Sequence, residues 1–288
     1  MLVAGSLLLF IAIASSGIAF ANFAEYNTDE LYCDPELCRL YNGTHFVVHE
    51  HIGCDNNGTL SPSCGDAPQL VEMNQRRINL ILDLHNAARN RIAIGKLPGY
   101  KPAAAMPVVK WDNELEFLAG LNVRTCRFKH DSCRNTDRFT LSGQNIGYIW
   151  QTRPIRSISR RIKFIVGKWF FEFPDAGQDY IESYKNHPKG KLIGHFTQMV
   201  SDRVQRVGCA AIRYTAEPLL GYKFLMTCNY DFTNISRQRV YVSGKPASNC
   251  TNRPSGRYQG LCDWDEDYQD SEESDEIGVN SLDIPVLL

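Results

Sequence analysis

The pattern of apolar and polar positions predicts a long helix in residues 68–94. Its apolar positions recur at spacings of three and four, the period of a helix with one face against a core. They are Ile78, Ile81, Leu82, His85, Ala88 and Ile92. Gly95 follows as a stop signal. A histidine on such a face is more often a core residue than a ligand, and we interpret His85 in that way.

Two further helices are expected downstream. Asp112 is suited to cap a helix that begins at residue 113 and ends near Cys126. Residues 155–173 have a helical pattern with Glu172 near its end. Four basic residues of this segment are interpreted as a solvated face. They are Arg156, Arg160, Arg161 and Lys163.

Strands are predicted around these helices. Residues 142–149 are typical of a short strand. An apolar run begins at residue 207, and residues 222–230 alternate inward and outward positions, so we expect these two runs to pair as antiparallel neighbours. Pro218 and Gly221 lie in the connection between them.

The first residues favour a cleaved leader. Residues 2–21 are apolar or small and uncharged, and Ala19 and Ala21 supply the small residues that a signal peptidase accepts. We therefore expect a signal peptide at residues 1–21 and secretion. The alternative is an uncleaved membrane anchor of about 20 residues, which the small residues disfavour. No later segment is apolar enough to span a membrane.

Cysteine usage agrees with secretion. The ten cysteines that follow the leader are even in number, which indicates disulfides formed in an oxidising compartment. A structural zinc site is the competing interpretation, but no Cys-x2-Cys pair occurs. Four sequons predict glycosylated surface positions: Asn42, Asn57, Asn234 and Asn249. Residues 22–66, rich in Gly, Asn, Cys and Pro, predict a disulfide-tied extended arm.

Charge divides the chain into a basic body and an acidic tail. Residues 263–288 contain ten Asp and Glu and no Lys or Arg. The whole chain has 31 basic and 32 acidic residues, so the part before residue 263 has 31 basic and 22 acidic residues and a net charge of +9. The tail should be disordered, because it has little apolar surface to bury. Residues 243–262 are interpreted as a linker. Nucleic-acid binding is disfavoured, because the chain is expected to be secreted and has no interleaved basic and aromatic run.

Several short motifs are the most specific signals. The run GHFTQMV at residues 194–200 is followed by VGCA at 207–210 and TCNYDFTN at 227–234, and earlier come HNAAR, HDSCR and GQNI, beginning at residues 85, 130 and 143. Together these segments resemble the signatures of the CAP superfamily of cysteine-rich secretory, antigen 5 and pathogenesis-related proteins. Within it, they resemble the antigen 5 branch of insect venom and salivary allergens. Ser201, Phe232 and Thr233 depart from the residues common there, Trp, Pro and Gly.

The resemblance implies an α+β fold, the three-layer α-β-α sandwich of the CAP type, over residues 67–242. It also implies that disulfides tie the arm to this domain and that the acidic tail lies outside it. The implied pairs are Cys33 with Cys54, Cys38 with Cys133, Cys64 with Cys126, and Cys209 with Cys228. Cys250 and Cys262 are left to form a local disulfide within residues 243–262.

The resemblance also implies a cleft. It is formed by His130, Gln144, Glu172 and His195, and in several family members the two histidines bind zinc or a similar ion. Two neutral imidazoles can hold zinc in an open shell while a carboxylate bonds the metal-bound water. Many members have Glu where this chain has Gln144. The chain thus lacks one negative charge and one general base, which should weaken metal affinity and hydrolysis.

Three function classes follow. The first is a secreted, monomeric, non-catalytic binding or effector protein, whose cleft or cavity takes a lipid, sterol or small amine. It is favoured because the chain has no Gly-x-Ser-x-Gly or His-Glu-x-x-His motif. The even number of cysteines also leaves no free thiol to act as a nucleophile. The second is a hydrolase, protease-like, that uses His130, His195 and Glu172. The third is a protein whose basic body binds a polyanion such as an acidic glycan.

Overall fold

The fold is built on two long antiparallel strands, β6 (Arg206–Thr215) and β7 (Tyr222–Tyr230). The structure is a computed structural model and describes residues 31–41, 44–65, 67–215 and 221–264. The predicted signal peptide, the Asn42 sequon and the tail beyond Trp264 lie outside the described residues. Both strands are almost wholly buried, because helices cover the sheet on its two faces.

Three further strands complete the main sheet. Its order is β3-β6-β7-β5, with β3 (Gln69–Val71) and β5 (Gly143–Gln151) antiparallel to their neighbours. The two-residue strand β4 (Lys110–Trp111) pairs parallel with β6. Successive side chains of a strand point to opposite faces. Val207 and Cys209 therefore belong to one core, whereas Ala210 and Ile212 belong to another.

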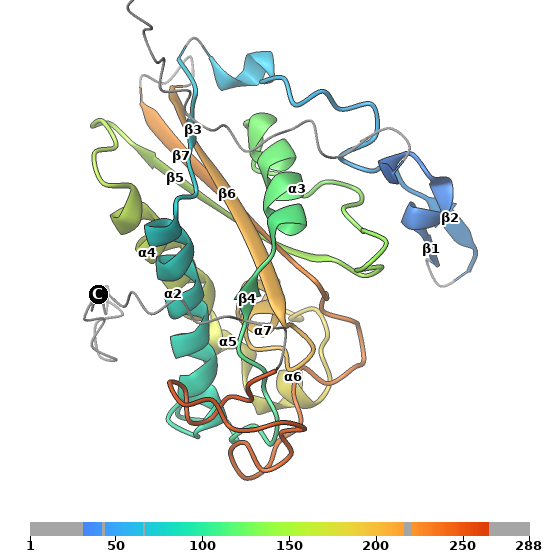
Figure 1. The fold of residues 1–288 in the computed structure, drawn as a ribbon, viewed down its shortest axis with the longest axis vertical. Helices are drawn as coiled ribbons and strands as arrows, with labels where there is room; N and C mark the ends of the chain where they lie inside the picture. Colours follow the sequence, from blue (N-terminus) through green and yellow to red (C-terminus); the bar gives the residue numbers. More distant parts are fainter. Residues whose placement is uncertain (1–30, 42–43, 66, 216–220, 265–288) are drawn as a thin grey trace, which may run out of the picture.

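Helices form the two outer layers (Figure 1). On one face lie α2 (Gln75–Ala93), α4 (Ile158–Phe170) and the short α7 (Gly194–Met199). On the other face α3 (Asn113–Arg124) crosses β6 and β7. Two short helices, α5 (Phe173–Ala176) and α6 (Gln178–Glu182), follow α4. The architecture is the expected three-layer α-β-α sandwich.

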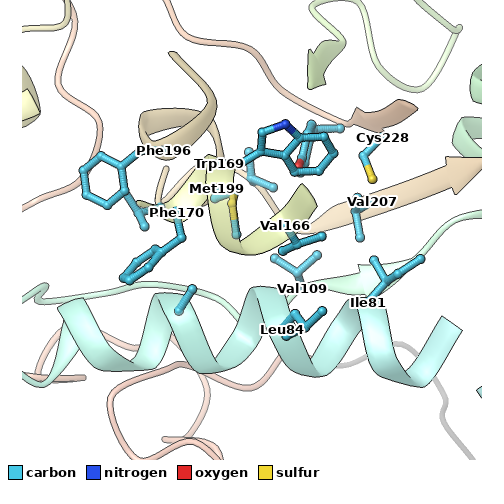
Figure 2. Packing of buried hydrophobic residues seen from close by; sticks show 14 of the residues in the cluster. Ile81, Leu84, Val109, Val166, Trp169, Phe170, Phe196, Met199, Val207 and Cys228 are labelled. Atoms are coloured by element: carbon cyan, nitrogen blue, oxygen red, sulfur yellow. The ribbon is translucent and has the colours of Figure 1, made fainter. Parts of the chain in front are cut away.

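The larger core lies between α2, α4 and the sheet. Ile81 and Leu84 of α2 point toward Val109 and Val166 (Figure 2). His85 lies on the same face, wholly buried, where its Nδ1 bonds the Ile81 carbonyl at 2.8 Å and its Nε2 bonds the Tyr230 hydroxyl at 2.9 Å. His85 is thus a satisfied core residue, as predicted.

The helix expected at residues 68–94 begins later than predicted. Asn74 caps α2 by accepting a hydrogen bond from the Arg77 amide, and residues Gln69–Val71 form β3 instead. This segment pairs with the edge of β6, so its backbone N–H and C=O groups form hydrogen bonds across the sheet instead of within a helix. The helix expected at 155–173 is also shorter: it spans Ile158–Phe170, so Glu172 lies just beyond its end.

The N-terminal arm packs on the outer side of α3. It contains the two-stranded sheet of β1 (Arg39–Tyr41) and β2 (Phe46–Val48) and the 3-10 turns η2 (Pro35–Cys38) and η3 (Pro62–Cys64). Tyr32 is buried against α3, and its hydroxyl donates to Glu114 at 3.1 Å. Four disulfides join the pairs that the resemblance implies, and the fifth joins the two cysteines left over. They are Cys33–Cys54, Cys38–Cys133, Cys64–Cys126 and Cys209–Cys228, and then Cys250–Cys262.

The segment predicted as a linker, residues 243–262, is instead packed onto the body. Leu261 is wholly buried in the main core, and the Tyr258 hydroxyl bonds Asp83 of α2 at 3.1 Å. The backbone of Cys262 forms an isolated parallel β-bridge with Pro107. The segment has too little periodicity to predict this contact, because its apolar residues are single anchors between polar turns.

Candidate functional site

One half of the candidate site is an imidazole held by an amide. His130 follows α3 in an exposed loop, and Gln144 is the second residue of β5. The Gln144 Oε1 atom lies 2.7 Å from His130 Nδ1, while its Nε2 donates to Asp131 Oδ2 at 2.9 Å and to Asn229 Oδ1 at 3.0 Å. An amide whose nitrogen donates to two oxygens presents its own oxygen as acceptor, so His130 Nδ1 carries the proton. The His130 Nε2 atom then carries the lone pair.

The other half is an imidazole held by a carboxylate. Glu172 Oε1 lies 2.6 Å from His195 Nδ1. Its Oε2 accepts the backbone N–H groups of His195 and Phe196 at 3.0 and 3.2 Å, in the first turn of α7. Such N–H groups have no partner within their own helix, so a carboxylate there is stabilising. Both Glu172 oxygens are thereby occupied.

Packing fixes the His195 ring from further directions. The Trp169 ring stacks on it, with 5.8 Å between ring centroids and 22° between planes. Asn145 Nδ2 donates to the His195 carbonyl at 3.2 Å. The His195 side chain is only 18% exposed and that of Glu172 12%. The Trp169 ring and the Glu172 hydrogen bond together support one orientation of the imidazole.

Electrostatics favour neutral imidazole at His130. Burial is the main cause that lowers the pKa of His130 below 6.5. The Gln144 hydrogen bond opposes this shift, the nearby positive charge of Arg134 reinforces it, the Asp131 carboxylate opposes it, and the neighbouring His195 ring lowers the pKa slightly further. Neither Nε2 atom has a hydrogen-bond partner among the described residues. The arrangement can donate two imidazole lone pairs to a cation.

The structure thus brings the four predicted cleft residues together as two pairs. The pairs are His130 with Gln144 and His195 with Glu172. Sequence reasoning did not assign roles to Asn229, which orients Gln144, or to Trp169, which supports His195. The signal for Asn229 was available, because TCNY is a motif segment and Asn229 lies opposite Gln144 in the antiparallel register.

A second group of metal-ligating residues, among those described, lies in the arm. Cys38, His51 and Cys133 are close together and buried. The two cysteines form a disulfide, so neither offers a thiolate. His51 is already satisfied, because its Nε2 bonds the Asn135 carbonyl at 2.8 Å and its Nδ1 accepts the Gly53 amide at 2.9 Å. This group does not fit a metal ion.

A cavity of about 630 Å³ adjoins His130, between the arm and the end of α3. Its lining is largely polar and includes Asn57, Asn122 and Asp131. Asn57 and Asn249 of the predicted sequons are exposed. Asn234 is half-buried, and its Nδ2 donates to the Gly194 carbonyl at 3.0 Å, so the expectation of an open surface position does not hold there.

Comparisons with known proteins agree with these motifs. The profile of the Cysteine-rich secretory protein family (CAP) matches residues 82–230. The chain is 42% identical over 196 residues to the antigen 5 like allergen Cul n 1 of Culicoides nubeculosus, covering 68% of this chain and 89% of that protein. It is 37% identical over 237 residues to venom allergen-1 of Aedes aegypti, covering 80% and 86%.

Solved structures show the same fold. The crystal structure of NaASP2 with Zn2+ superposes with a TM-score of 0.54 at 24% identity, over 66% of this chain and 96% of that one. The structure of BmVAL-1 gives 0.55 at 20% identity, over 67% and 96%. In the described part of the chain, no helix is long and apolar enough to cross a membrane. The chain therefore belongs to the Cysteine-rich secretory protein (CAP) family, with antigen 5 and venom-allergen proteins among its relatives.

Proposed function

We propose that this chain is a secreted, antigen 5-like binding or effector protein whose His130–His195 cleft binds a divalent cation and performs no catalysis. The observation that carries the proposal is the state of Glu172. Both of its oxygens accept hydrogen bonds from within the protein. Glu172 is thereby engaged in orienting His195 and the adjacent backbone N–H groups, and Gln144, the other polar residue of the cleft, is a neutral amide, so neither side chain is placed as a free carboxylate base.

Metal binding is supported by the orientation of the rings. Metal-bound histidines commonly donate their second ring N–H to a carboxylate or carbonyl, which fixes the tautomer. His130 and His195 both have this arrangement, with acceptors at 2.7 and 2.6 Å. Two nitrogen ligands suit zinc and leave positions for water or a ligand. NaASP2, a structural neighbour, was crystallised with Zn2+.

Secretion is supported by covalent structure. The five disulfides involve all ten cysteines of the chain, and such a framework persists in oxidising compartments. Relatives of the chain are named as venom and antigen 5-like allergens. The ligand of the cleft is proposed to be polar, such as a small amine, rather than a lipid or sterol, since the adjoining cavity is lined largely by polar side chains.

The test is zinc titration of the full chain secreted from eukaryotic cells and stripped with a chelator. Calorimetry or native mass spectrometry should give one zinc per chain. The substitutions His130→Ala and His195→Ala should each weaken binding by at least about tenfold, because each removes one of two protein ligands. His49→Ala is the matched control, because His49 lies in the arm outside the cleft, and it should bind as wild type does.

A peptide-library assay separates binding from the hydrolase alternative. The proposal expects no turnover with or without zinc. Turnover that disappears in Glu172→Gln would establish hydrolysis and overturn the non-catalytic part. Zinc binding that survives the His130→Ala/His195→Ala double substitution would overturn the metal site.

A further inference from the structure

A row of exposed aromatic side chains leads away from the cleft along β5. Phe128, Tyr148 and Trp150 are 63%, 38% and 43% exposed. The Phe128 and Tyr148 rings are 5.9 Å apart between centroids, and Lys223 Nζ lies 5.9 Å from the Tyr148 centroid. The register sets Trp150 opposite Lys223 of β7. We call these four residues the aromatic strip.

The strip is elongated and begins at the cleft. Gln144, Tyr148 and Trp150 occupy even positions of β5 and so share one face of the sheet. The loop before His130 runs beside the strand, since His130 bonds Gln144 and Phe128 contacts Tyr148. The seven residues from Gln144 to Trp150 span about 20 Å. A ligand along this line would be linear.

Charge around the strip favours an anion. Lys223 belongs to the strip, and the exposed Arg127 and Lys129 flank Phe128. Within the described ranges, no ion pair involves any of these three cations. The carboxylate of Asp131, the acid beside His130, is paired with Arg134.

We propose that the aromatic strip binds a linear sulfated polysaccharide. Aromatic faces offer flat apolar area against which sugar rings pack, and the three cations are placed to pair with sulfate groups. Tyr148 and Trp150 are more than half buried, so they offer less freely projecting apolar surface than side chains that insert into a bilayer do. The sulfated polysaccharide is therefore a better match than an anionic membrane.

The test measures binding of a size-defined heparin oligosaccharide to the full glycosylated chain in 150 mM NaCl. Wild type should bind, and affinity should fall as salt rises. The triple substitution Arg127→Ala/Lys129→Ala/Lys223→Ala should weaken binding at least about tenfold, since each charge-assisted contact contributes. Trp150→Ala should weaken it about fivefold without removing a charge.

The matched control is Arg156→Ala/Arg160→Ala/Lys168→Ala, which removes three exposed cations beside and within α4. Its affinity should stay within about twofold of wild type, because these charges lie outside the strip. The double substitution His130→Ala/His195→Ala should also leave heparin binding intact, so the strip is tested separately from the cleft. No binding of wild type, equal losses in both triple variants, or tighter binding to phosphatidylserine vesicles than to heparin would each overturn the proposal.

Discussion

Gln144 is the residue on which the orientation of His130 depends. Its amide nitrogen donates to Asp131 and Asn229, and Asn229 in turn donates to the Leu115 carbonyl at 3.3 Å. This chain of bonds leaves the Gln144 oxygen to accept from His130 Nδ1. A neutral amide therefore performs the orienting task that the family resemblance assigns to a carboxylate.

The substitution Gln144→Glu should raise the pKa of His130. A carboxylate beside Nδ1 stabilises the imidazolium, and an opposite charge at this range shifts a pKa by about one unit or more. Zinc affinity at neutral pH should increase by about tenfold, because a charged acceptor makes the ring a stronger donor. NMR titration of the His130 ring protons measures the first effect, with Gln144→Met as the uncharged control. An unchanged His130 pKa would contradict the assignment of this pair.

His85 should make stability depend on pH. Burial is the main cause that lowers the pKa of His85 from 6.5 to about 4. Between pH 6.5 and about 4, His85 is therefore protonated in the unfolded chain but neutral in the folded one. Stability from this group is complete above pH 6.5 and decreases as the pH falls, by about 3 kcal/mol near pH 4. Burial raises the pKa of Asp231 to about 6, so the contribution of this group to stability increases as the pH falls, opposite to that of His85.

The test for His85 is the difference in unfolding free energy between wild type and a variant, compared at two pH values. Urea unfolding of wild type and His85→Gln at pH 7 and pH 5 isolates the histidine, because all other groups titrate in both proteins. The variant should be less stable at pH 7, and the gap should narrow at pH 5. A gap that is the same at both pH values would mean that His85 does not titrate as its burial requires.

At the scale of elements, two glycines should respond oppositely to alanine. A Cβ atom at Gly208 of β6 would lie 2.1 Å from the Glu116 amide nitrogen and 2.4 Å from the Asp112 carbonyl oxygen, both backbone atoms of α3. Gly208→Ala should therefore cost about 3 kcal/mol or more by forcing α3 from the sheet. At Gly167 within α4, such a Cβ would have no described atom within 4 Å apart from the neighbouring backbone of its own helix. Gly167→Ala should stabilise by about 1 kcal/mol.

Chemical unfolding of the two variants beside wild type checks this pair of predictions. Equal effects, or a neutral Gly208→Ala, would show that α3 does not approach β6 as closely as described. The comparison also separates packing from helix propensity, because only Gly208 has backbone of another element against it.

Elements with strong local signals could be predicted from the sequence. Apolar periodicity located α2 and α3, and Asp112 was recognised as the cap that accepts from the Leu115 amide at 3.0 Å. The strand β3 could not be predicted, because three residues have little pattern and depend on the edge of β6. Glu172 was expected near a helix end, but its contact with α7 depends on a turn of the chain beyond α4.

At the scale of the whole molecule, the disulfides decide how firmly the arm is held. Cys38–Cys133 spans 95 residues, whereas Cys250–Cys262 spans 12. Chain entropy predicts that removing the first pair as alanines costs about 4–5 kcal/mol and removing the second about 3 kcal/mol. Thermal unfolding of the two double variants should show the larger loss of stability without Cys38–Cys133. Limited proteolysis should show early cleavage in the arm for that variant and not for the one without Cys250–Cys262. Equal proteolysis of both would contradict this order.

Contacts between distant segments are what the sequence could not provide. Arg127, Phe128 and Lys129 are neighbours in the sequence, but only folding places Phe128 on Tyr148 and Lys223 beside it. Residues 243–262 have the composition of a linker, yet Leu261 completes the main core. The residues of the cleft were identified only through resemblance, because His130 and His195 lie 65 positions apart.

The central claim is that both cleft imidazoles present an unprotonated Nε2 atom. A long-range 1H–15N correlation spectrum of the imidazole rings, recorded at pH 7.5 before and after one equivalent of zinc, tests it most directly. We predict the Nδ1–H tautomer for His130 and His195 without metal, and a shift of both Nε2 resonances when zinc is added. The Nε2–H tautomer at either residue, or Nε2 resonances that zinc leaves unchanged, would contradict the account.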